Sequence, residues 1–241
     1  MLALDVINWR RPWLAPYRAL GEGLAQSVLQ GASVCEALNQ CASSLDGASD
    51  LPQFVPQSAL PEGQAYEAFV FQTRQVPTRD NLHDFFNGLI WLHEGALKRR
   101  LNELQATEIA AQGIGQHRGS RRDALTLFDE NAVILQAPAA LLQALEQRDW
   151  PQLFIELRPL WLQTKVQIVG HALLEKLVYP RKPIAAHVWR RDGLMDGLAL
   201  KPFAPLPVLG IPGWWAENED VGFYADAAVF RPPRGQVLLR S

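Results

Sequence analysis

Two groups of polar side chains lie along stretches that are otherwise apolar. The stretch TRDNLHDFFNGLIWL carries the first group, which comprises Asp80, His83, Asp84 and Asn87. The stretch WLQTKVQIVGHALLEKLV carries the second group, which comprises Thr164, Gln167, His171 and Glu175. At about 100° per residue each group would fall on one side of a helix. We therefore expect each group to form a polar strip, and the two strips to face a shared internal polar site.

The residue types in these strips predict one of two chemistries. Imidazole and carboxylate groups together bind divalent transition metals such as zinc, manganese or iron. A carboxylate beside a histidine can instead hold the ring in one tautomer for proton transfer. We expect four residues to be catalytic, and the same four to be the ligands of a divalent metal: His83, Asp84, His171 and Glu175.

A purely structural role is the alternative for both strips. Asp80 would cap its helix, and His83 would bond a backbone carbonyl. His171 would be a core histidine that is satisfied by Glu175. In that case the chain is a non-catalytic binding or scaffold protein whose polar strips form a buried network. Convergence of the two histidines in space would favour the enzyme over the scaffold.

We therefore expect a metal-dependent or acid–base hydrolase-like enzyme, and the arginine side chains predict that its substrate is small and anionic. The loop GIGQHRGSRRD offers backbone amides and three guanidinium groups that could cradle a phosphate or carboxylate. It matches neither the phosphate-binding loop nor the dinucleotide fingerprint, so a solvated basic loop is the alternative. The predicted substrate-binding residues are Arg79, Asn87, Arg118, Arg121 and Arg122.

Helices must position most of these side chains. Hydrophobic spacing predicts helices over residues 20–45, 96–111, 138–149 and 151–178, the last carrying the second strip. The first strip lies on a helix that Thr78 or Asp80 would cap. Aromatic and β-branched content predicts a strand over residues 66–72. The segments ALTLF and VILQA predict a hairpin that turns at residues 129–132.

The fold class predicted from these elements is α+β: one mainly helical domain over residues 1–241 with a small antiparallel sheet. Of these 241 residues, 48% are hydrophobic and 20% are charged, as in globular chains. Residues 1–19 form an aromatic packing arm in this prediction, and residues 46–64 form a connecting loop rich in proline and glycine. Residues 179–241 are expected to be a long irregular C-terminal segment.

Charge and hydropathy exclude two function classes. A net charge of −2 gives no electrostatic footprint for general nucleic-acid binding. No stretch reaches the eighteen or so apolar residues of a membrane span, and no secretory signal is recognised. We therefore expect a cytoplasmic protein. Cys35 and Cys41 are the only cysteines, and their separation of six in a helix makes a disulfide between them unlikely. Two thiols without a second pair also disfavour a structural zinc site built on cysteine.

Several motifs occur together in a characteristic order. They are YEAFVFQTRQVPTRDNLHDFFNGLIWL, RRDALTLFDEN, GHALLEKLVYP followed by AAH, and LPVLGIPGWWAENED followed by FYADAAVFRP. As a set, from about residue 66 to 234, they resemble an uncharacterised proteobacterial family, domain of unknown function 3025 (DUF3025). The resemblance implies no assigned activity. The chain departs from the family pattern at Glu94-Gly95, where an apolar residue and proline are expected, and at Ala132, where glycine is expected.

Overall fold

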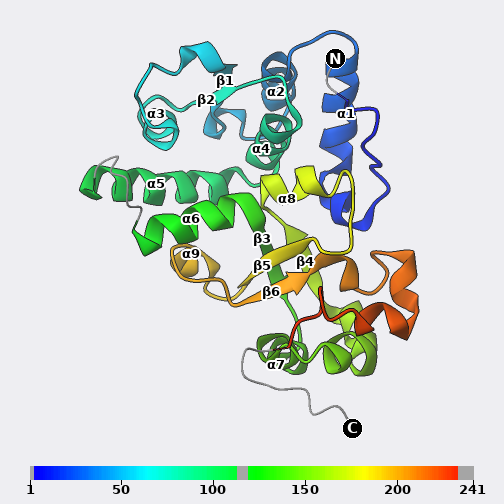
Figure 1. The fold of residues 1–241 in the computed structure, drawn as a ribbon. Coiled ribbons are helices and arrows are strands. Elements are labelled where there is room, and N and C mark those ends of the chain that lie inside the picture. The colour runs from blue at the N-terminus through cyan, green and yellow to red at the C-terminus, as the bar shows by residue number, and fades with distance from the viewer. Residues whose placement is uncertain (1–2, 113–118, 233–241) are drawn as a thin grey trace.

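The computed structural model describes residues 3–112 and 119–232, and helices dominate its N-terminal half (Figure 1). Six helices precede the main sheet in the chain: α1 (Arg18–Leu29), α2 (Val34–Ser43), α3 (Tyr66–Thr73), α4 (Leu82–His93), α5 (Gly95–Gln112) and α6 (Ser120–Asn131). A parallel pair of short strands, β1 (Gln53–Pro56) and β2 (Gln75–Thr78), lies among them. In Figure 1, α5, α6 and α8 lie between the larger sheet and the helices α2, α3 and α4.

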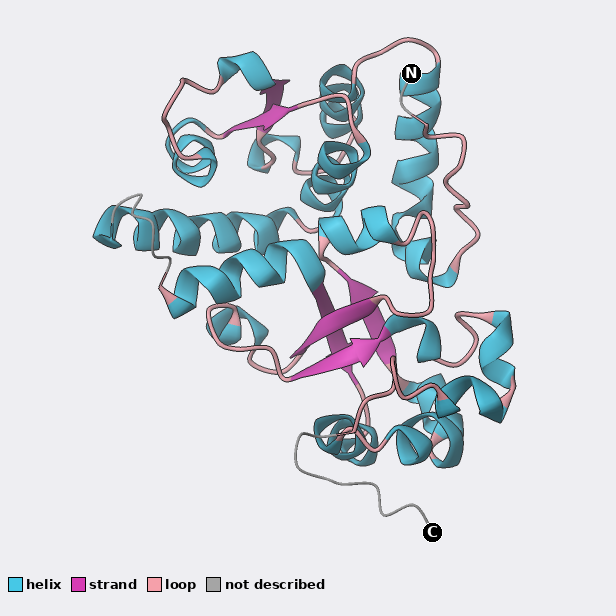
Figure 2. Ribbon diagram, viewed as in Figure 1, coloured by secondary structure: helices cyan, strands magenta, loops and turns pink. Residues whose placement is uncertain are grey.

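The larger sheet has four strands in the order β4-β3-β5-β6 (Figure 2). Its strands are β3 (Ala132–Gln136), β4 (Lys165–Ile168), β5 (Ala185–Arg190) and β6 (Ala204–Pro207). Three further helices accompany them: α7 (Ala139–Gln147), α8 (His171–Lys176) and α9 (Leu194–Gly197). The mainly helical α+β class is thus confirmed. The sheet is mixed and not antiparallel throughout, because the chain returns through α8 and pairs β5 parallel to β3.

Both faces of the sheet are covered by apolar side chains. On one face, Val133 and Leu135 join a large core that extends to the N-terminal helices. On the other face, Ile134 and Trp189 pack against α5, α6 and α9 in a separate apolar cluster. Adjacent residues of β3 therefore point into different cores, as strand geometry requires.

The helix predicted over residues 20–45 is two helices. Helix α1 ends before Gly31, whose φ of 109° is in the left-handed region that favours glycine. Ser33 then starts α2 with a reciprocal cap. The Ser33 side chain accepts a hydrogen bond from the Glu36 backbone N–H, and the Glu36 side chain accepts one from the Ser33 backbone N–H. The signal for this break was present in the sequence as a serine three residues before a glutamate.

The strand predicted over residues 66–72 is wrong, because this segment is helix α3. Phe69 and Val70 bury one side of the helix, and Arg74 ends it with a left-handed φ of 56°. The strand follows instead as β2, which pairs with β1 inside the predicted connecting loop of residues 46–64. Aromatic content indicated a buried segment correctly but did not distinguish a helix from a strand.

The hairpin predicted around residues 129–132 is also wrong. The segment ALTLF belongs to α6, where Ala124, Leu125 and Phe128 are buried at helical spacing. The chain passes from Asn131 directly into β3, and Ala132 has an ordinary φ of −78°. The strand predicted over VILQA is confirmed, because all of this segment except its last residue lies in β3.

The long helix predicted over residues 151–178 is replaced by several short elements. A π-helical turn (Gln152–Glu156) and a 3-10 helix (Arg158–Gln163) lead into β4, and only then does α8 begin. Pro159 lies at the start of the 3-10 helix and lacks the N–H that a continuous α-helix requires. The predicted helices over residues 96–111 and 138–149 are confirmed as α5 and α7.

The termini and the cysteines complete the fold. Trp13 and Tyr17 of the N-terminal arm are buried, and the segment from residue 179 supplies β5 and β6, so it is less irregular than predicted. Cys35 and Cys41 are both free, as predicted. Within the described ranges, no helix has the length and apolar character needed to cross a membrane.

Candidate functional site

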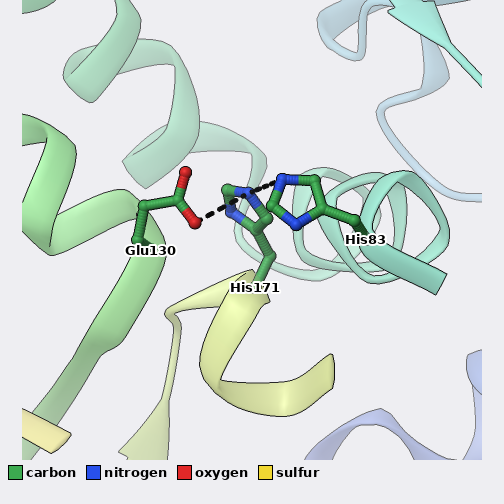
Figure 3. A group of neighbouring side chains, drawn as sticks. All are labelled: His83, Glu130 and His171. Carbon is green, nitrogen blue, oxygen red and sulfur yellow. Dashed lines mark hydrogen bonds and ion pairs between the residues drawn. The ribbon is translucent and has the colours of Figure 1, made fainter. Parts of the chain in front are cut away.

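The two predicted histidines meet in space although 88 residues separate them in the chain. His83 is at the start of α4 and His171 is the first residue of α8. Their Nε2 atoms are 2.9 Å apart, and their ring centroids are 4.3 Å apart with the planes inclined at 79°. The helices α4 and α8 pack against each other along this contact. Figure 3 shows both rings, with one Nε2 directed at the other.

A local cap fixes the position of His83. Asn81 begins α4, and its side-chain oxygen accepts a hydrogen bond from the Asp84 backbone N–H at 2.7 Å. The expected caps, Thr78 and Asp80, have other partners: the Thr78 hydroxyl donates to Val76, and Asp80 accepts from the first backbone N–H of α2. Since Asn81 sets the first turn, His83 projects from the end of α4 that faces α8.

A close backbone approach fixes the position of His171. Gly170 lies against the end of α6, and a Cβ atom there would be 2.5 Å from the Ala132 backbone nitrogen and 2.6 Å from Asn131. The Gly170 N–H donates to the Ala132 carbonyl at 3.0 Å. Only glycine allows this approach without displacing backbone. It places His171 beside the last residues of α6.

Glu175 orients the ring of His83. Its Oε2 atom is 3.0 Å from His83 Nδ1, and a carboxylate can only accept, so the proton of His83 is assigned to Nδ1. The other nitrogen, Nε2, then carries a lone pair that faces His171. Glu175 follows His171 by one helical turn, so the predicted pairing of these two residues becomes a pairing of Glu175 with His83.

Glu130 is the third residue of the cluster that could bind a metal, and the sequence analysis did not predict it. Its Oε2 atom is 3.6 Å from His171 Nε2, and one atom each of His83, Glu130 and His171 lie within 4.8 Å of one another. In Figure 3 the Glu130 carboxylate extends from the end of α6 toward His171. The predicted hairpin had made Glu130 a turn residue, and only its position at the end of a helix brings it to the histidines.

Asp129 and Lys98 form a buried ion pair behind His171. Lys98 Nζ binds Asp129 Oδ1 and also donates to the Asn87 side-chain oxygen at 2.8 Å. Burial raises the pKa of Asp129, but Lys98 and His171 lower it by more, so the pKa lies well below its ordinary value. Asp129 is therefore a carboxylate, and its Oδ1 is 3.7 Å from His171 Nδ1.

One side of the cluster is open to solvent and the other is buried. The side chain of His171 is 5% exposed, whereas those of His83, Glu130 and Glu175 are 34%, 35% and 39% exposed. A small molecule can therefore reach the side chains from one direction. The buried side holds Asp129 and Lys98 in fixed positions.

Asp84, a predicted ligand, lies outside this cluster. Its carboxylate accepts from the Arg79 backbone N–H at 2.7 Å and from two nitrogens of the Arg79 guanidinium at 3.0 Å. Asn87 donates to the Tyr66 hydroxyl and accepts from Lys98, so it touches the cluster only through Lys98. Both residues of the first strip therefore have structural partners.

The remaining predicted residues that the structure describes have partners other than the histidines. Gln167 donates to Glu94, and the Thr164 hydroxyl donates to a backbone carbonyl. Arg121 pairs with Glu108 at 2.9 Å in the first turn of α6, where Arg122 also lies. Arg118 lies outside the described residues. In the second strip, Thr164 precedes β4, Gln167 lies in β4, and only His171 and Glu175 of α8 reach the site.

Comparison with known proteins identifies a family but no activity. A family model described as "Protein of unknown function (DUF3025)" matches residues 52–199 and 192–234. No curated protein matches the chain, and no solved structure matches it.

Proposed function

Since the chain belongs to the DUF3025 family, whose description assigns no function, we propose from the site alone that it is a metal-dependent hydrolase. In this proposal His83 Nε2, His171 Nε2 and Glu130 Oε2 hold one divalent transition metal. The observation that carries the proposal is the convergence of these three donor atoms from three different helices. Two imidazoles and one carboxylate are the ligand set of many catalytic zinc sites and of non-haem iron sites.

Two neighbouring carboxylates support the proposal of a metal site, because each one faces the Nδ1 atom of a histidine whose Nε2 atom would bind the metal. Metal-binding histidines usually donate their second ring N–H to a carboxylate. Glu175 accepts from His83 Nδ1 in this way, and Asp129 faces His171 Nδ1. Without a metal, the His171 proton on Nε2 would satisfy His83 and leave the buried His171 Nδ1 without a hydrogen bond, as observed. A metal on Nε2 would place the proton on Nδ1, where it faces Asp129.

The distances between donors require only small movements for binding. Two nitrogens bound to one tetrahedral zinc ion lie about 3.3 Å apart, given zinc–nitrogen bonds of about 2.0 Å. The two Nε2 atoms are 2.9 Å apart, and Glu130 Oε2 is 3.6 Å from the His171 nitrogen. The three ligand atoms all lie within 4.8 Å of one another, so rotations of the partly exposed His83 and Glu130 side chains would bring them to one ion.

Three protein ligands would leave one coordination position of a bound metal open for water. A closed structural zinc site has four protein ligands, whereas a catalytic site keeps one position open. A bound metal would lower the pKa of water toward neutrality and polarise a carbonyl or phosphoryl oxygen. The chain would hold the rings of His83 and His171 in a fixed orientation, and it would bring Glu130 to the metal as the carboxylate ligand.

The nature of the substrate stays a prediction. A small anionic substrate was expected from the arginines, but Arg79 and Arg121 both have carboxylate partners. The positive charge of a bound metal would itself attract an anion. The cytoplasmic location also stays part of the proposal, supported by the two free cysteines, which suit a reducing compartment.

A non-catalytic scaffold is the second candidate, and one observation favours it. The contact between the two Nε2 atoms at 2.9 Å is already a hydrogen bond, so the cluster ties α4 to α8 without any ion. In that case the polar cluster would fix helices and bind nothing. The two proposals differ in whether the protein takes up metal and whether activity depends on that metal.

We expect hydrolysis of p-nitrophenyl acetate or bis(p-nitrophenyl) phosphate only by metal-loaded protein. Removal of the metal by a chelator should lower kcat/KM by roughly a hundredfold or more, since a metal contributes several kcal/mol to such reactions. Glu130→Gln should lower it similarly, and Glu146→Gln on the exposed side of α7 should not. Metal-loaded protein that hydrolyses neither ester, or does so equally after chelation, would contradict the hydrolase.

A further inference from the structure

A second polar recess lies at the opposite end of β4 from His171. It has a volume of about 150 Å³ and is lined by Ile134, Gln136, Lys165, Gln167 and Arg191. The strand register explains why these residues meet, because Gln136 is paired with Lys165, and Ile134 with Gln167. Directly opposed residues of an antiparallel pair point to the same face of a sheet.

Arg191 reaches this recess from the neighbouring strand. It follows the end of β5 and donates its backbone N–H to the Leu135 carbonyl at 2.9 Å. Because side chains alternate along a strand, Arg191 points to the same face as Trp189, which is paired with Ile134. Arg190, the preceding residue, points to the other face and stacks on the ring of Phe203.

Two side-chain cations face this recess. Among residues 3–112 and 119–232, neither Lys165 Nζ nor the Arg191 guanidinium forms a close ion pair or a side-chain hydrogen bond, and Glu94 interacts with Arg191 only at longer range. The amide groups of Gln136 and Gln167 add hydrogen-bonding capacity to the same wall. Two cations and two amides around a small recess are suited to an oxyanion.

One nearby carboxylate limits the charge of the ligand. Glu94 accepts from His93 at 2.9 Å and from Gln167, and it lies close enough to Arg191 to interact electrostatically. Lys165, Arg191 and Glu94 together carry a net charge of +1. The recess therefore suits a monoanion better than a dianion such as phosphate.

An adjoining recess supplies an apolar wall. It has a volume of about 410 Å³ and shares Ile134 and Arg191 with the smaller one. Leu97, Leu194 and Met195 also line it. Glu94 and Asp196 also line it, and they would repel a second negative charge on the ligand. The smaller recess thus provides the cationic side chains, and the adjoining recess provides an apolar wall.

We propose that this double recess binds a small monocarboxylic acid with a short apolar tail. The carboxylate lies between Lys165 and Arg191, and the tail lies against Leu97, Leu194 and Met195. The site is separate from the histidine cluster, and its occupancy does not depend on a metal. It would serve as a substrate-recognition or effector site for an organic acid.

Sodium hexanoate tests this proposal by calorimetric titration of the full chain. We expect Arg191→Gln to weaken hexanoate binding roughly 10- to 100-fold, as for the loss of a charged hydrogen bond, and Lys165→Gln to act in the same direction. Arg190→Gln is the matched control, because it makes the same charge change at the preceding residue, whose side chain lies on the opposite face of the sheet. It should alter the affinity less than twofold.

Three comparison ligands make the outcome decisive. Hexanol lacks the charge, acetate lacks the tail, and inorganic phosphate carries a different charge and shape. Weaker binding of all three than of hexanoate is expected. Equal effects of Arg190→Gln and Arg191→Gln, tighter binding of phosphate, or no hexanoate binding at 50 mM (a concentration well above the roughly 1 mM range of weak specific sites) would overturn the proposal. Melting temperatures of the variants will confirm that each is folded.

Discussion

We expect zinc or manganese to raise the melting temperature of the wild-type protein but not that of His171→Ala. A ligand that binds only the native state stabilises it, by about 2.7 kcal/mol when its concentration is 100 times Kd. His171 supplies one of three donor atoms, and the remaining pair, His83 and Glu130, makes only a partial coordination sphere. The metal-dependent rise should therefore be lost, whatever the melting temperature of the metal-free variant.

Glu175→Gln gives a graded comparison for the same measurement. Glu175 contacts the outer nitrogen of His83 and is not itself a ligand in our proposal. Loss of such a partner weakens metal binding about 10- to 100-fold without abolishing it. His93→Ala, at the other end of α4, is the control and should bind metal as the wild type does. Unchanged metal-induced stabilisation of His171→Ala would exclude His171 from the site.

Lys98→Met will destabilise the protein by about 3 to 5 kcal/mol, because it removes the partner of a buried charge. The side chain of Lys98 is 6% exposed and that of Asp129 is 19% exposed, so water can solvate the remaining carboxylate only in part. The aliphatic chain of methionine fills most of the space of lysine, and little of the effect should come from lost packing. Urea unfolding of both proteins at neutral pH measures the difference.

The double variant Lys98→Met with Asp129→Leu separates the two origins of this loss. If the single substitution destabilises by leaving a charge unpaired, the double variant should recover most of the stability, because no buried charge remains. Additive losses in the double variant would show that packing and not charge is the cause. The same double variant should bind metal more weakly, since Asp129 no longer faces His171 Nδ1.

The residue types were enough to predict part of this site. The other residues were not predicted, because the secondary structure around them was predicted wrongly. His83, His171 and Glu175 were selected because histidines and carboxylates on apolar stretches need partners, and the structure brings these three together. Glu130 and Asp129 were not selected, because a hairpin turn at that position would have exposed them. Their roles depend on α6 continuing to Asn131.

Helices with a regular apolar period were predicted well, whereas short elements were not. Helix α5 follows its pattern closely. The apolar run from Pro151 to Val178 has the composition of a buried helix, yet Pro159 and the β-branched residues of β4 divide it. Apolar runs show burial more reliably than they show the type of element. Contacts across 88 residues, such as that between the histidines, cannot be read from local spacing at all.

X-ray absorption spectroscopy of zinc-loaded wild-type protein shows directly whether two histidines and a carboxylate bind the metal. After dialysis, we expect about one equivalent of zinc that is bound by two imidazole nitrogens at about 2.0 Å and by oxygen donors, as for a site with two histidines and one carboxylate. The spectrum of Glu130→Ala should lose one oxygen donor or the metal itself. Zinc that dialyses away from the wild-type protein, or that is bound without imidazole, would contradict the account.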